Sequence, residues 1–218
     1  MSNPVIVVVG AGPGISGSVA RRFGREGYDV GLIGLDDAML TELGAGLQAD
    51  GVETGWAVAD IADGQALTAA VERFGYHKGR IDVLHFNPSA YRPKSPLELT
   101  PAELCQDLAI GVGGLLTALQ AAKQYMSSGA RITATGSAAA DTPDPGAASL
   151  GIQKASLRNL IRSIDTALTP EGIRAVSVTV QGVLAREGAF TPDKVADAIY
   201  AAATQDEANW RDEVPYSG

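Results

Sequence analysis

The 218-residue sequence predicts an α/β fold: one doubly wound parallel sheet of six to seven strands with helices on both faces. Two observations predict it. Short apolar, β-branched runs alternate along the whole chain with longer segments of helical periodicity. The short runs are apolar throughout rather than alternating with polar residues, which is typical of strands that helices cover on both sides. We therefore expect a single domain over residues 1–218, with a short C-terminal segment.

The expected strands follow from the apolar runs. The first is the unbroken apolar run at 5–9, and the others lie at 30–33, 53–59, 81–86, 130–135 and 173–180, with a possible edge strand at 211–214. Because these strands alternate with helices, right-handed crossovers would place the carboxyl ends of all of them along one edge of the sheet. Residues directly after each strand are therefore the candidates for function.

The expected helices show apolar residues every three or four positions. They lie at 14–26, 38–47, 63–75, 101–126 and 149–168, and a last helix starts at Pro192 after the N-cap Thr191. Thr100, Pro101 and Glu103 form a capping-box pattern at the start of the longest one.

Composition excludes several classes of function. The net charge is −8 and the sequence pI is about 4.7, so the chain lacks the basic surface that nucleic acids or anionic membranes require. Cys105 is the one cysteine, so no intrachain disulfide can form, and its apolar helical context predicts a core thiol. The N-terminal apolar run is too short for an export signal or a membrane span. We therefore expect a cytoplasmic protein that binds neither nucleic acid nor membrane.

A glycine-rich turn follows the first strand and opens the first helix. Gly12, Gly14 and Gly17 spell G-x-G-x-x-G, and Gly10 precedes them. Glycine lets the backbone approach a pyrophosphate, and a helix N-terminus offers free N–H groups to it. In this position the motif predicts a Rossmann-type dinucleotide site. The alternative is a glycine-rich turn without a ligand.

The ends of the next strands carry acidic or small polar residues. Asp36, about twenty positions after the turn, is expected to accept the adenosine ribose hydroxyls and to disfavour a 2′-phosphate. NAD is therefore favoured over NADP, although Leu35 beside it leaves NADP open. Asp36 could equally cap the following helix, and the two roles are compatible. Asp60, the run 87–89 and Ser137 follow the third, fourth and fifth strands.

These segments together resemble the short-chain dehydrogenase/reductase family over nearly the whole chain. GAGPGIS is similar to the family's glycine turn, with Gly10, Gly14 and Ser16 at its three glycine positions, and HFNPSA is similar to its NNAG segment. The resemblance implies that Asp60 lies at the adenine ring, that Ser137 in ATGSAA is the active-site serine, and that Lys154 in LGIQKASLRNL is the lysine of YxxxK. The expected cofactor-binding residues are Gly10, Gly12, Gly14, Ile15, Ser16, Asp36, Asp60, Ile61, Asn87, Pro88, Ser89 and Lys154.

The sequence departs from the family pattern at two catalytic positions. Leu150 stands where the family carries its proton-transferring tyrosine, and Gly111 stands where it carries a helix asparagine. Removing a general acid typically costs roughly 10²- to 10⁴-fold in rate. Tyr91 is a candidate replacement, against the alternative of a loop tyrosine that covers apolar surface. The expected catalytic residues are Ser137, Lys154 and Tyr91.

Other candidate groups are expected to be structural. We expect His85 to be a satisfied buried histidine, and Asp141 and Asp144 to be turn residues. No His, Cys or carboxylate spacing suggests a metal site. Gln181-Gly182 replaces the family's Pro-Gly, and the chain after it is short, so the usual substrate-covering segment is largely missing.

The leading hypothesis is an NAD(P)-dependent oxidoreductase that transfers hydride to or from a small carbonyl or alcohol substrate. The alternatives are a non-catalytic dinucleotide-binding sensor or partner-binding protein, and a scaffold that binds no cofactor. The resemblance also implies a homodimer or homotetramer, because equivalents of the helices at 101–126 and 149–168 pair subunits in the family.

Overall fold

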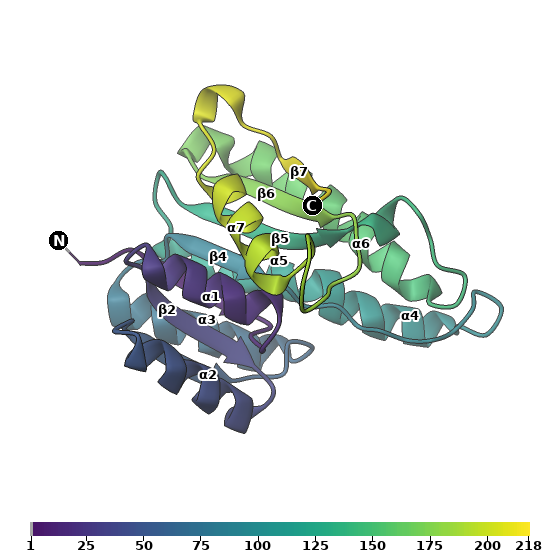
Figure 1. The fold of residues 1–218 in the computed structure, drawn as a ribbon, viewed down its shortest axis with the longest axis horizontal. Helices are drawn as coiled ribbons and strands as arrows, with labels where there is room; N and C mark the ends of the chain where they lie inside the picture. Colours follow the sequence, from purple (N-terminus) through teal and green to yellow (C-terminus); the bar gives the residue numbers. More distant parts are fainter. Residues whose placement is uncertain (1) are drawn as a thin grey trace.

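The structure is a computed structural model and describes residues 2–218. Within this range seven strands form one sheet in the order β3-β2-β1-β4-β5-β6-β7, and all neighbouring pairs are parallel (Figure 1). The strands are β1 (Val5–Val9), β2 (Asp29–Gly34), β3 (Thr54–Val58), β4 (Val83–Phe86), β5 (Arg131–Ser137), β6 (Arg174–Val180) and β7 (Glu213–Tyr216). The chain runs outward from β1 to β3 and then returns to β4 on the other side of β1. The doubly wound fold class is confirmed.

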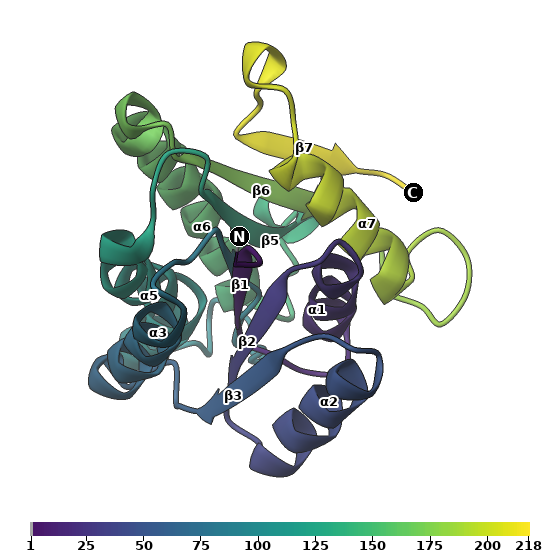
Figure 2. The ribbon, with the colours of Figure 1, turned by 90° about the vertical axis from the view of Figure 1, so that its left-hand side faces the viewer.

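Helices cover both faces of this sheet (Figure 2). They are α1 (Ile15–Arg25), α2 (Asp37–Ala49), α3 (Gly64–Lys78), α4 (Pro101–Leu108), α5 (Gly114–Ala122), α6 (Ala148–Leu168) and α7 (Pro192–Ala203). Side chains of α3, α5 and α6 belong to one apolar cluster, and side chains of α1, α2 and α7 belong to the other. The sheet is therefore the middle of three layers.

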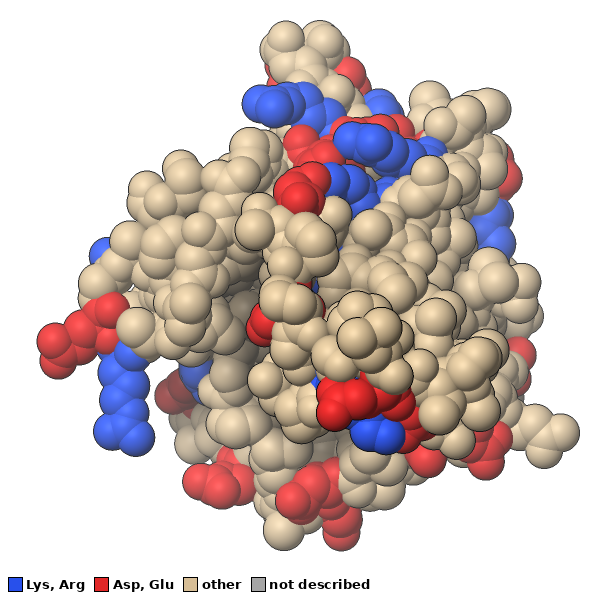
Figure 3. Space-filling model, turned by 90° about the vertical axis from the view of Figure 1, so that its right-hand side faces the viewer, with Lys and Arg blue, Asp and Glu red and all other residues tan. Residues whose placement is uncertain are grey.

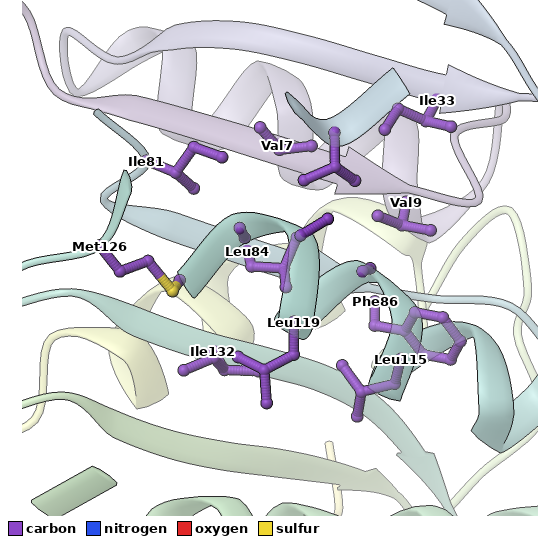
Figure 4. Packing of buried hydrophobic residues seen from close by; sticks show 14 of the residues in the cluster. Val7, Val9, Ile33, Ile81, Leu84, Phe86, Leu115, Leu119, Met126 and Ile132 are labelled. Atoms are coloured by element: carbon purple, nitrogen blue, oxygen red, sulfur yellow. The ribbon is translucent and has the colours of Figure 1, made fainter. Parts of the chain in front are cut away.

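Each continuous apolar strand contributes side chains to the apolar clusters on both faces of the sheet. Val7 and Val9 of β1 point into the cluster beneath α3, α5 and α6 (Figure 4), whereas Ile6 and Val8 belong to the opposite cluster. Successive strand residues point to opposite faces, so a strand covered on both sides must be apolar at every position. Burying each such side chain contributes about 1.5–3 kcal/mol.

The expected helix at 101–126 is present as one helical stretch over Pro101–Tyr125, but not all of it is α-helical. Its start is confirmed, with the Thr100–Glu103 capping box and Pro101 in the first turn. After α4, however, a π-helical segment (Ala109–Gly113) intervenes before α5. This π-helical widening was not predicted, because the apolar periodicity does not distinguish it from an α-helix. The segment contains Gly111 and adjoins Gly114, whose missing side chains leave room for Gln153 and Ile61.

The expectation of a core thiol is also wrong. Cys105 is exposed on α4. The inward positions on this helix are taken by Asp107, which is buried, and by Leu104 and Leu108, which are half-buried. Cys105 follows Leu104, and one residue turns the helix by about 100°, which carries the thiol away from that face.

One helical stretch, Pro101–Tyr125, is long and apolar enough to cross a membrane by length and composition alone. Core helices of soluble proteins meet the same criterion, so the stretch is weak grounds for a membrane span.

Candidate cofactor and active site

The parallel sheet brings the expected site segments to one edge. The strand arrows in Figure 1 point to the right, and Figure 3 views the molecule from that side. The glycine turn follows β1, Asp36 follows β2, Asp60 follows β3, Asn87 follows β4 and Ser137 ends β5. This face carries both acidic and basic side chains and no large basic area (Figure 3). Ligands bind at this edge in doubly wound folds, next to the point where strand order reverses.

The glycine turn is shaped by close backbone approaches. Gly10 has φ +79°, and a Cβ there would lie 2.7 Å from the Cγ of Pro88, which links the turn to the segment after β4. A Cβ on Gly17 would lie 2.6 Å from the carbonyl oxygen of Gly12. Glycine is therefore required at both positions, at Gly10 by conformation and at Gly17 by space.

The first turn of α1 is free to receive an anion. Gly14 is its N-cap residue; no side chain caps the helix, and its first turn holds no acidic residue. A Cβ on Gly14 would meet nothing within 4 Å, so the space before the helix is open. Ser16 and Ile15 are buried, and the Ser16 hydroxyl donates to the carbonyl of Gly12 at 3.4 Å. Uncapped N–H groups at a helix N-terminus are what a pyrophosphate requires, so the turn fits that group.

The acidic residues after β2 and β3 are exposed at the same edge. One carboxylate oxygen of Asp36 accepts the Met39 N–H at 3.0 Å, so its capping role is confirmed. Asp60 accepts the Ala62 N–H at 2.9 Å. The next residue, Ile61, is half-buried against Gly114 of α5. Both carboxylates thus lie after β2 and β3, at the sheet edge where the sequence predicts that the adenosine binds.

The segment after β4 lies across the glycine turn. The N–H of Asn87 donates to the carbonyl of Val9 at 3.1 Å, which continues the pairing of β4 with β1. Pro88 is buried and Ser89 is exposed. Tyr91, the candidate replacement acid, is 71% exposed.

Lys154 is buried beside the end of β5. It is 6% exposed, and its Nζ donates to the carbonyl of Thr135 at 2.9 Å. Burial lowers the pKa of Lys154 to about 8. Ser137 lies two residues after Thr135, and its Oγ accepts the Ala139 N–H at 3.2 Å. Leu150 is half-buried one helical turn before Lys154, as the sequence alignment with YxxxK implied.

His85 lies within the sheet and has a structural partner. Its Nδ1 is 2.8 Å from the Thr133 hydroxyl on β5, and its Nε2 has no partner among residues 2–218. Burial, assisted by the nearby charge of Lys154, lowers the pKa of His85 to about 3. The imidazole is therefore neutral at physiological pH. We expected both ring nitrogens of His85 to be hydrogen-bonded, and only Nδ1 has a partner among residues 2–218.

Sequence reasoning missed one buried polar residue, Gln153. It is 0% exposed and bonds to both backbone groups of Ala90, in the segment after β4. The sequence offered one indication of Gln153: Gly111 has no side chain in the middle of a long helix, which leaves space for a side chain from another helix. In the part of the chain that the structure describes, no group of three His, Cys, Asp or Glu side chains is placed to hold a metal ion.

Known oxidoreductases resemble this chain in sequence. The sequence matches the family model of the short chain dehydrogenases over residues 4–189. An oxidoreductase of Sarocladium schorii, asL5, is 30% identical over 178 residues, covering 80% of this chain and 70% of that protein. Short-chain dehydrogenase reductase 5 of Arabidopsis thaliana is 27% identical over 187 residues, covering 84% and 71%.

Solved structures extend the likeness to the whole chain. A short chain dehydrogenase from Burkholderia cenocepacia in complex with NADP has a TM-score of 0.91 at 25% identity, covering 99% of this chain and 96% of its own. A metagenomic short-chain oxidoreductase, also in complex with NADP, has a TM-score of 0.87 at 26% identity, covering 99% and 97%. The matched model spans most of the sequence and the fold agrees throughout, so this chain belongs to the short-chain dehydrogenase family of oxidoreductases.

Proposed function

We propose that the protein is an NAD(P)-dependent oxidoreductase that acts on a small carbonyl or alcohol substrate. The observation that carries the proposal is the joint placement, at one sheet edge, of an uncapped glycine turn and of Lys154 with Ser137. A buried ammonium group that donates to a backbone carbonyl, as Lys154 does to Thr135, is costly to a protein, which suggests a functional role. Two structural neighbours in complex with NADP support a dinucleotide at this edge.

The cofactor would lie along the carboxyl ends of the strands. The N-terminus of α1, at Gly14 to Ser16, would bind the pyrophosphate, and Asp36 would accept hydrogen bonds from the adenosine ribose. Asp60 and Ile61 would border the adenine. Asn87, Pro88, Ser89 and Lys154 would border the nicotinamide ribose. When bound, the dinucleotide supplies or accepts the hydride, and the chain's own residues position and protonate the substrate.

Ser137 and Lys154 would act on the substrate oxygen. The Ser137 hydroxyl can donate a hydrogen bond to a carbonyl oxygen and so orient it. With a pKa of about 8, Lys154 is mostly protonated at pH 7 and is a stronger acid than an ordinary lysine. We propose Lys154 as the proton donor in place of the missing tyrosine, with exposed Tyr91 as the alternative donor.

The proposal favours NAD over NADP. Asp36 and Asp37 follow β2, and both are exposed. In the proposed binding mode, a 2′-phosphate would lie beside them. Like charges at short range repel, so the phosphorylated cofactor should bind more weakly. The two NADP complexes among the neighbours point the other way, which makes cofactor choice the first property to measure.

Calorimetric titration with NAD⁺, NADH, NADP⁺ and NADPH tests the cofactor. We expect saturable binding with preference for the pair that lacks the 2′-phosphate, and Asp36→Asn should reduce that preference. Binding of none of the four would overturn the proposal.

A panel of aldehydes, ketones and alcohols, followed at 340 nm, tests the chemistry. We expect turnover that falls roughly 10²-fold or more in Lys154→Met and Ser137→Ala but not in Tyr91→Phe. Loss only in Tyr91→Phe would transfer the proton-donor role to Tyr91. Tight cofactor binding without turnover would favour the non-catalytic alternative, which Leu150 at the tyrosine position suggests.

We also propose a cytoplasmic location. Exposed Cys105 is a free thiol, and such thiols persist in reducing compartments. Fractionation of source cells would test this.

A further inference from the structure

The segment 89–94, which we call the rim strap, runs from the site edge after β4 toward α4. Its residues alternate between half-buried and exposed positions. Ala90, Arg92 and Lys94 are half-buried, whereas Tyr91 and Pro93 are exposed. Each of the three inward residues is bonded to a helix, so the strap is held at regular intervals although it has no strand or helix structure of its own.

The first tie is made by Gln153 of α6. Its Oε1 accepts the N–H of Ala90 at 2.9 Å, and its Nε2 donates to the carbonyl of Ala90 at 3.0 Å. The second hydrogen of Nε2 reaches the carbonyl of Ser149 at 3.2 Å, in the same helix. The amide is fully buried, so it binds both backbone groups of one strap residue without competition from water.

This tie depends on the absence of a side chain at Gly111. A Cβ at Gly111 would overlap Gln153 Oε1 and would lie 3.0 Å from Cδ and 3.1 Å from Cγ. Gly111 belongs to the π-helical segment between α4 and α5. The two positions are therefore coupled: the amide of Gln153 occupies the space that any other residue at 111 would fill.

The other two ties connect the strap to α4, and Lys94 also bonds to Ala148 at the start of α6. The guanidinium of Arg92 binds the buried Asp107 through two hydrogen bonds, of 3.0 Å and 2.9 Å. Lys94 pairs with Glu103 at 2.6 Å, and the carbonyl of Lys94 accepts the N–H of Ala148 at 3.1 Å. Gln153 is the only one of these partners adjacent in sequence to a proposed catalytic residue, Lys154.

We propose that Gln153 is a positioning residue, which holds Ala90 and thereby fixes Ser89 and Tyr91 as the substrate rim next to Lys154. This inference rests on the proposed function and adds a determinant of substrate fit to it. The tie fixes the rim before substrate binds, so its loss should weaken substrate binding more than proton transfer. Gly111 is the partner position that makes the tie possible.

Gln153→Met tests the tie, because methionine is similar in volume but offers no amide. We expect KM for the best carbonyl substrate to rise roughly tenfold while kcat changes little. The pH dependence of kcat should not change, because Lys154 keeps its hydrogen bond to the Thr135 carbonyl. The matched control is Gln120→Met, at an exposed position of α5, which should leave KM unchanged. An unchanged KM in Gln153→Met, or an equal loss in kcat, would overturn the proposal.

Gly111→Ala tests the coupling without removing any polar group, and it covers the case in which Gln153→Met fails to fold. We expect Gly111→Ala to raise KM, and the same change made in a Gln153→Ala background to add little further. Equal, additive effects in the two backgrounds would contradict the coupling.

Hydrogen–deuterium exchange of the Ala90 amide tests the tie without requiring enzymatic activity. We expect the amide to be protected in the wild type and to exchange faster in Gln153→Met and Gly111→Ala, but not in Gln120→Met. If the wild-type protein has no enzymatic activity, the proposed function is overturned, but the exchange rate of the Ala90 amide still tests the hydrogen bonds between Gln153 and Ala90. Unchanged exchange in an active enzyme would overturn the tie alone.

Discussion

At the scale of single residues, two buried basic groups lose their protons at lower pH than such groups ordinarily do. Lys154 and His85 both have a lowered pKa, and burial is the main cause in each case. Burial disfavours the charged form of either group because the interior solvates it less well than water. The two differ in position: Lys154 lies at the site, whereas His85 hydrogen-bonds within the sheet to Thr133.

The lowered pKa of Lys154 predicts the pH dependence of carbonyl reduction. If its ammonium group donates the proton, the rate constant should be constant below pH 8 and fall about tenfold per pH unit above it, as the acid form is lost. Lys154→Arg should remove this break, because arginine does not deprotonate in that range. Stopped-flow reduction at saturating cofactor would measure it. A profile unchanged in Lys154→Arg would assign the break to another group.

The lowered pKa of the buried His85 leads us to expect that the folded protein loses stability in acid. Its folded pKa of about 3 lies below the ordinary 6.5, so below pH 6.5 the unfolded chain binds a proton that the folded protein excludes. Stability therefore falls as pH drops from 6.5 toward 3, by up to about 1.4 kcal/mol per pH unit from this group. His85→Gln should lose less stability over that range in urea denaturation. The control, exposed His77→Gln, should follow the wild type. Identical slopes in all three proteins would contradict the prediction.

At the scale of elements, the glycine turn should tolerate no side chain at Gly17. A Cβ there would press on the Gly12 carbonyl, so the turn that we propose to bind the pyrophosphate would have to shift. We expect Gly17→Ala to lower cofactor affinity at least about tenfold in calorimetry and to cost roughly 1–3 kcal/mol of stability. Gly46→Ala, on the exposed face of α2 where a Cβ meets nothing, is the control and should stabilise the protein slightly. Equal affinity in the two variants would show that the turn does not bind the phosphates.

Elements built from local patterns could be predicted from the sequence. β1 was predicted with its observed bounds, because its apolar residues end at a glycine, and Thr100 identified the start of α4 correctly. The π-helical segment could not be predicted from the local pattern, and the contacts beside it, of Gln153 with Gly111 and of Ile61 with Gly114, join residues that are distant in the sequence. Contacts between residues that are distant in the sequence also explain why Gln153 was not among the predicted site residues. The turn and Lys154 lie in motifs, whereas Gln153 bonds to a residue 63 positions away.

At the scale of the whole molecule, we expect a homodimer or homotetramer. Leu116 of α5 and Ile152 of α6 are 43% and 42% exposed, although both lie in otherwise apolar helices. Sedimentation velocity should show the oligomer, and Leu116→Glu with Ile152→Glu should shift it toward the monomer, since a charge is costly in an interface core. Leu97→Glu, in the loop before α4, is the control. A monomeric wild type would contradict the expectation.

Because α7 packs against α1, one face of α1 stays uncovered during synthesis until α7 has been made. Phe23 of α1 packs edge-to-face on Tyr200 of α7, and Ser18 donates a hydrogen bond to Asp193, 175 residues further along. At about 5–20 residues per second, translation takes roughly 10 to 35 seconds to cover that interval. Throughout it, the apolar outer face of α1 is a ready target for chaperones that bind exposed hydrophobic segments. The face of α1 that contacts α7 is thus covered only after the last α-helix has been synthesised.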